Sequence, residues 1–127
     1  MQHIALSLAG LIGTTTAIFH GIVTDRLMVK PVDRLLAADP GVSTIVRRIV
    51  PLLLHYSTYS WLVGGIALVI AANVAGAETR RWISWLVGAE FFYAAVANLW
   101  ATRGRHPGWV LMTAAVALIA VDLLGLL

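Results

Sequence analysis

The sequence predicts an all-α integral membrane protein, a compact bundle of four transmembrane helices in a single domain over residues 1–127. Three observations predict this fold class. Hydrophobic residues make up 60% of the chain and charged residues only 12%, whereas a soluble domain must present far more polar surface to water. Four apolar runs, at about 4–22, 51–74, 82–100 and 109–127, each approach the ~20 residues that cross a bilayer. The basic residues lie in the connections between these runs, where membrane topology accounts for them.

The first run, residues 4–22, carries a face of small residues. Ala5, Ala9 and Gly13 recur at four-residue spacing, which places them on one side of a helix. Small residues let helices approach closely in a membrane, so we expect this face to pack against another helix. The run has no basic segment before it and no A-x-A cleavage motif after it, which predicts a retained span rather than a cleaved signal peptide.

Residues 23–50 form the longest segment outside the apolar runs, and we expect a cytoplasmic loop that contains a short helix. Apolar residues at helical spacing, including Val32 and Leu35, alternate with charged ones, which is typical of a helix lying in the membrane interface. Asp39 followed by Pro40 then predicts the N-cap and first turn of the next helix.

The second run, residues 51–74, combines two glycines with a polar edge. Gly64 and Gly65 lie near its middle and predict another close contact between helices. His55 and Tyr59 lie four residues apart, so they share one line along the helix. Both are therefore candidates for binding a ligand or a proton.

The third run, Trp82 to Trp100, contains a buried acid. Its terminal tryptophans are typical of the two membrane–water interfaces, and Glu90 lies close to its middle. An ionised acid at the bilayer centre costs on the order of 3 kcal/mol on insertion scales. We therefore expect Glu90 to face protein and to be either protonated or partnered. Asn98 is a further polar candidate on this helix.

The distribution of Lys and Arg orients the bundle, because cytoplasmic loops carry an excess of both. Seven lie in the first and third connections and two in the second: Arg26, Lys30, Arg34, Arg47, Arg48, Arg103 and Arg105 against Arg80 and Arg81. We therefore expect the first and third connections in the cytoplasm and both termini outside. A bacterial inner membrane is the natural setting.

With this orientation, the rise of about 1.5 Å per residue groups the polar side chains at two depths. His20, His55 and Asn98 fall near the cytoplasmic edge of the hydrocarbon. Glu90 and Asp122, the only charged residue of the fourth run, fall together nearer the outer side. Sequence does not define helix rotation, so which of these groups face each other stays open.

Several function classes are excluded by what the chain lacks. Without cysteine there are no disulfides, thiolate zinc sites, iron–sulfur clusters or covalently attached c-type haem. The motifs of serine hydrolases, zinc proteases, P-loop NTPases and dinucleotide-binding enzymes are also missing. The sequence therefore gives no enzymatic assignment and favours a non-enzymatic protein. We predict no metal site, and the scattered basic residues predict no nucleic-acid partner.

Three functions remain. The one we favour is a non-enzymatic helical module that associates with itself or is a subunit of a larger membrane complex, with membrane lipids and membrane proteins as partners. The second is a proton-coupled small transporter, because Glu90 and Asp122 close together in low dielectric would share a proton. The third is a b-type haem or quinone protein that uses His20 and His55. No cofactor is predicted outside this third case.

Overall fold

The computed structural model describes residues 3–126, and every regular element in this range is helical. The elements are α1 (Ile4–Thr24), the π-helical turn η1 (Asp25–Val29), α2 (Lys30–Ala38), α3 (Thr44–Val74), α4 (Ala77–Thr102) and α5 (Gly108–Leu123). The predicted all-helical fold is confirmed. Of the four predicted spans, three lie in helices long and apolar enough to cross a membrane within the described residues.

The helix α5 is shorter than the predicted fourth span. Its 16 residues reach about 24 Å, less than the ~30 Å of a typical hydrocarbon core. The helix ends because Gly125 adopts the left-handed region with φ 66°, and the Leu126 N–H donates to the Val121 carbonyl as in a Schellman cap. The helical part of the fourth run therefore stops at Leu123.

The segment from α1 to α2 is one continuous helix of 35 residues, so the predicted short helix is present as α2 but is not separated from the first span. In place of a break there is one π turn, in which the Lys30 N–H donates to the Asp25 carbonyl. Pro31 follows this turn immediately. A proline ring clashes with the carbonyl four residues before it, here that of Leu27, and the wider π winding accommodates this carbonyl without ending the helix.

The helix α3 begins later than the Asp39–Pro40 pair predicts. Ser43 is its N-cap, and the Ser43 hydroxyl accepts a hydrogen bond from the Val46 N–H at 3.3 Å. Asp39 instead ends α2, and its carboxylate accepts a hydrogen bond from the Gly41 N–H at 2.8 Å. Aspartate forms such turns as readily as it caps helices, so the local sequence did not distinguish the two roles. The predicted long loop is reduced to the turn around Gly41.

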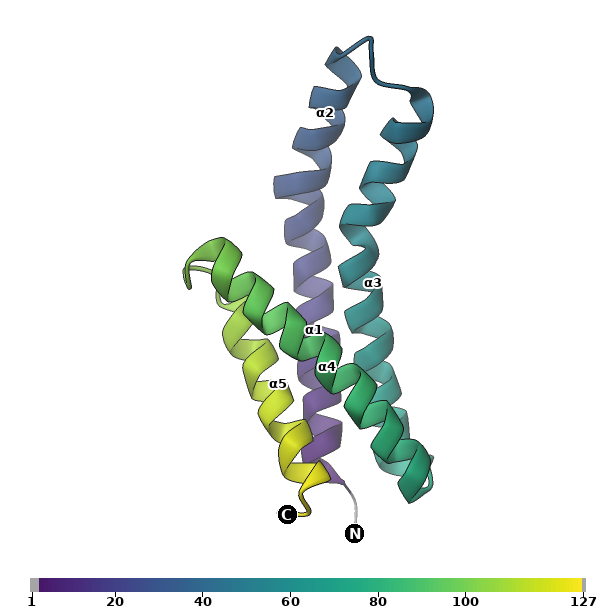
Figure 1. The fold of residues 1–127 in the computed structure, drawn as a ribbon, viewed down its shortest axis with the longest axis vertical. Coiled ribbons are helices and arrows are strands. Elements are labelled where there is room, and N and C mark those ends of the chain that lie inside the picture. The colour runs from purple at the N-terminus through teal and green to yellow at the C-terminus, as the bar shows by residue number, and fades with distance from the viewer. Residues whose placement is uncertain (1–2, 127) are drawn as a thin grey trace.

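The helices form a ring in which α1 contacts α3 and α5, and α4 contacts α5 and α3. Figure 1 shows α4 crossing the α1 and α3 pair obliquely, close to α3 at the lower end and well away from it at the upper end. Both termini and the α3–α4 connection lie at the lower end, and the other two connections lie toward the opposite end. The bundle is therefore tightest near the termini and widens away from them.

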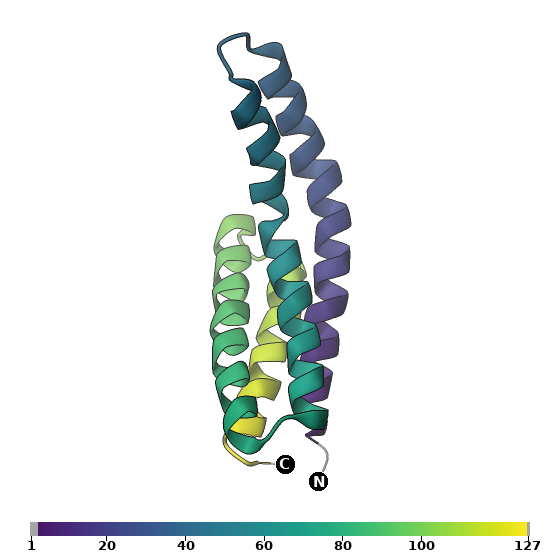
Figure 2. The same ribbon diagram turned by 90° about the vertical axis from the view of Figure 1, so that its right-hand side faces the viewer.

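The helix α2 and the first part of α3 project as a hairpin beyond the region where all helices overlap (Figure 2). The 35-residue helix spans about 52 Å, which exceeds a hydrocarbon core of ~30 Å. The hairpin therefore extends past the hydrocarbon when the four-helix region lies within it.

Two contacts at glycines define how closely the helices approach. A Cβ atom on Gly10 of α1 would lie 2.6 Å from the Gly65 carbonyl oxygen of α3, and one on Gly65 would lie 2.7 Å from the Gly10 carbonyl oxygen. The two backbones therefore touch, and no larger residue fits at either position without a shift. In the middle of the bundle, Gly13 leaves room for the fully buried ring of Phe91 from α4.

Candidate functional site

Several polar side chains line a cavity of about 480 Å³ between α3 and α4, which we call the Glu90 cavity. Its wall consists of His20 from α1, Tyr56, Ser57, Ser60 and Trp61 from α3, and Glu90, Tyr93, Ala94, Ala97, Asn98 and Ala101 from α4. An apolar and aromatic wall with a few polar groups is typical of sites that bind small molecules.

Figure 1 shows α4 diverging from α3 toward the end of α4, and residues of both helices line the Glu90 cavity. A Cβ atom on Gly64 of α3 would lie 3.1 Å from Val87 Cγ1 and 3.3 Å from Glu90 Oε2. Further along α4 the cavity wall includes the small residues Ala94 and Ala97. Small side chains on diverging helices leave the space that the cavity occupies.

Glu90 is half-buried, midway along α4, and lines this cavity. The ion pairs among residues 3–126 join His3 to Asp122 and Asp25 to Lys30, and neither includes Glu90. Burying a charge without a partner is costly, so a cation that enters the cavity would stabilise the Glu90 carboxylate.

His20 lines the same cavity and is held in place by three neighbours. Its Nε2 atom lies 3.1 Å from Ser57 Oγ and 3.2 Å from Thr24 Oγ1, and its ring packs against Trp61 with 4.4 Å between ring centroids. Because both hydroxyls approach Nε2, the Nδ1 atom is the ring nitrogen left for another partner.

A smaller cavity of about 260 Å³ adjoins the first and shares His20, Trp61 and Asn98 with it. Its wall also includes Thr16, whose buried hydroxyl has no hydrogen-bond partner among the described residues, and His106 from the α4–α5 connection. The sequence did not predict that His106 lines a cavity. The signal available was its position just after the third span, on the side of the membrane where the first span ends near His20.

The structure does not bring Asp122 to Glu90. Asp122 Oδ1 lies 2.7 Å from His3 Nδ1, and Asp122 lines a separate cavity together with Arg80 and Arg81. Because α5 ends at Leu123, Asp122 lies in its last turn. Whether the two carboxylates face each other was open from the sequence, and in the described residues Asp122 pairs with His3 instead.

His55 and Tyr59 lie outside both cavities that His20 lines. His55 is half-buried and Tyr59 is 66% exposed on α3. Neither cavity provides a space between the imidazoles of His20 and His55 in which a haem would fit. In the part of the chain that the structure describes, no three His, Asp or Glu residues are grouped to hold a metal ion.

The small residues singled out in the sequence lie inside the bundle. Ala5, Ala9 and Gly13 are buried on α1, and Gly64 and Gly65 are buried on α3. Their faces are therefore used between helices of one chain and are not free for a second copy.

Comparisons with protein-family models, with curated proteins and with solved structures find no match.

Proposed function

We propose that this protein is a non-enzymatic integral membrane protein that binds a small amphiphilic cation in the Glu90 cavity. The observation that carries the proposal is the position of Glu90, an acid midway along a membrane helix that lines a cavity and has no cation of the described chain beside it. The same cavity is lined by the rings of Tyr56, Trp61 and Tyr93. Aromatic faces attract cations, and the carboxylate supplies the counter-charge.

The proton-coupled transporter considered from the sequence would depend on Glu90 alone, because Asp122 pairs with His3 instead.

The proposal places the protein in a bacterial inner membrane with four spans, α5 included, and with both termini outside. It is supported by the seven-to-two distribution of Lys and Arg. It is also supported by the arrangement in Figure 1, where the first and third connections, which together hold the seven, lie toward the end opposite the termini. In this orientation the Glu90 cavity lies on the cytoplasmic side of Glu90.

Titration of the purified protein with tetraphenylphosphonium, a lipophilic cation, tests the proposal. Wild-type protein in nanodiscs should bind the probe saturably, and Glu90→Gln should abolish binding because a neutral amide supplies no counter-charge. Glu78→Gln is the matched control, since Glu78 lies exposed in the first turn of the same helix and outside the cavity. Equal binding by wild type and Glu90→Gln would overturn the proposal.

The projecting hairpin supports a second function, association with another chain. Its exposed apolar side chains include Leu35 at 71% and Ile45 at 69% exposure. Where the hairpin extends past the hydrocarbon, such side chains are more stable when another surface covers them. This favours a module that associates with itself or with a larger membrane complex. The mass of the purified protein in native detergent tests it, and a mass equal to one chain would contradict self-association.

A further inference from the structure

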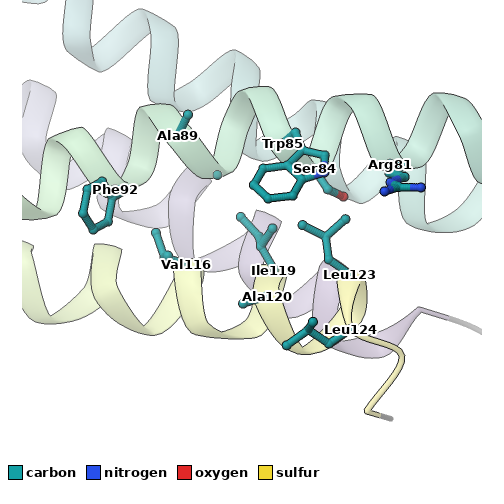
Figure 3. Close-up of a pocket in the computed structure, with 11 residues that line it drawn as sticks. Arg81, Ser84, Trp85, Ala89, Phe92, Val116, Ile119, Ala120, Leu123 and Leu124 are labelled. Carbon is teal, nitrogen blue, oxygen red and sulfur yellow. The ribbon is translucent and has the colours of Figure 1, made fainter.

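A second large cavity, of about 510 Å³, lies between α4 and α5, apart from the Glu90 cavity. Figure 3 shows its wall, in which apolar side chains of the two helices face each other and Arg81 lies at one end. Phe92 lies toward the opposite end. The cavity is therefore a narrow apolar groove that ends at a single cation.

The length of this groove matches one leaflet of a bilayer. Arg81 and Phe92 are eleven residues apart on α4, which corresponds to about 16 Å along the helix. Half of a hydrocarbon core is roughly 15 Å. Because Arg81 lies near the start of α4, the groove runs from the membrane surface to about the bilayer midplane.

A buried hydroxyl lies in the groove close to the cation. Ser84 is fully buried and lines the cavity, and its Oγ atom has no hydrogen-bond partner among residues 3–126. It lies three residues, about one turn, from Arg81. A buried donor without a partner is unfavourable, so an acceptor oxygen from a bound molecule would stabilise this position.

The guanidinium of Arg81 is available at the mouth of the groove. It takes part in neither ion pair of the described residues. Asp122 lines an adjoining cavity with Arg81 but is paired with His3 at 2.7 Å. The neighbouring Arg80 is already used, because its Nη1 donates to the Ala75 carbonyl at 3.3 Å.

We infer that the α4–α5 groove holds one acyl chain of an anionic phospholipid. The chain lies along the apolar wall toward Phe92, the phosphate pairs with Arg81, and an ester oxygen accepts a hydrogen bond from Ser84. Basic positions between transmembrane helices recognise anionic headgroups in this way. The site is independent of cation binding at Glu90, because no residue lines both cavities.

Native mass spectrometry of the full chain with added phosphatidylglycerol or phosphatidylcholine tests the inference. Wild-type protein should retain phosphatidylglycerol in preference to phosphatidylcholine. Arg81→Gln should lower this retention about fivefold, the effect of one basic residue at a membrane surface. Arg80→Gln removes the same charge from the adjacent residue outside the groove and should retain phosphatidylglycerol as wild type does. An equal loss in both variants would show general surface attraction and overturn the inference.

A second variant tests whether the acyl chain occupies the groove. Gly88 lines the cavity, and a Cβ atom there would meet Ile119 Cγ2 at 3.4 Å, which is ordinary contact. The backbone therefore accepts a side chain at this position, and a folded Gly88→Leu protein should fill the groove and lose the retained lipid. Retention of phosphatidylglycerol at the wild-type level by a folded Gly88→Leu protein would show that the chain lies elsewhere.

Discussion

The Nδ1 atom of His3 lies 2.7 Å from the Oδ1 atom of Asp122, and this contact joins the start of α1 to the end of α5 across 119 positions of sequence. The side chains are 33% and 10% exposed, so water screens the contact only in part. It closes the ring of helices at the end where both termini lie.

The first prediction concerns this closure. His3→Ala should lower the free energy of unfolding by about 1 kcal/mol, because Asp122 loses its partner while still largely buried. Thermal unfolding in a fixed detergent measures the change. Lys30→Ala is the control, since its pair with Asp25 is more exposed, at 58% and 39%, and should contribute little. Equal effects of the two substitutions would mean that the His3 contact stabilises no more than a surface pair.

The second prediction concerns the contact between α1 and α3. In Gly65→Ala the new Cβ would lie 2.6 Å from the Thr14 backbone nitrogen and 2.7 Å from the Gly10 carbonyl oxygen, so the helices must separate. We expect a loss of about 1 to 3 kcal/mol in stability. Gly88→Ala, a glycine in α4 with ordinary contacts, should be neutral or stabilising by up to ~1 kcal/mol. Similar melting temperatures for both variants would contradict the close approach.

The third prediction tests the packing of Phe91 over Gly13. Gly13→Ala should destabilise the protein because its Cβ would overlap the Phe91 ring. Phe91→Leu should also destabilise, through the space it leaves in the core. The double variant should lose less stability than the two single variants together, and the difference should be roughly 0.5 to 3 kcal/mol. The smaller leucine side chain makes room for the new methyl group. Additive losses in chemical or thermal unfolding would show that the two residues do not meet.

The fourth prediction separates ligand binding from structural support at Glu90. The described residues offer Glu90 no ion-pair partner. Glu90→Ala should therefore lower the free energy of unfolding by well below the ~1 kcal/mol typical of an interhelical hydrogen bond in a membrane. Glu90→Gln should be equally mild in thermal unfolding. A large loss in Glu90→Ala that glutamine restores would instead identify a structural hydrogen bond at this position.

The fifth prediction concerns topology, and it uses the absence of cysteine from the chain. A cysteine at Gly76, where a side chain would meet nothing within 4 Å, should react with an impermeant maleimide added to intact cells. A cysteine at the exposed Pro40, in the basic first connection, should react only after the membrane is permeabilised. The reverse pattern would contradict the orientation.

The membrane class and most helix positions followed from sequence alone, because a helix in hydrocarbon satisfies its own backbone and needs about twenty apolar residues to do so. The runs around Trp82 to Trp100 and Gly64 to Gly65 accordingly lie in helices. Local signals failed where one residue type has two roles. Asp39 makes a turn instead of a cap, and the π turn before Pro31 keeps α1 and α2 in one continuous helix.

The tertiary structure alone decided which polar groups meet. Depth along a helix is counted in residues, but rotation about its axis is set by packing, and here by contacts such as Gly10 on Gly65 and Phe91 over Gly13. These contacts orient Glu90 toward a cavity that also contains His20, while the end of α5 leaves Asp122 beside His3. No spacing within one helix specifies such pairs, because each depends on the rotations of at least two helices.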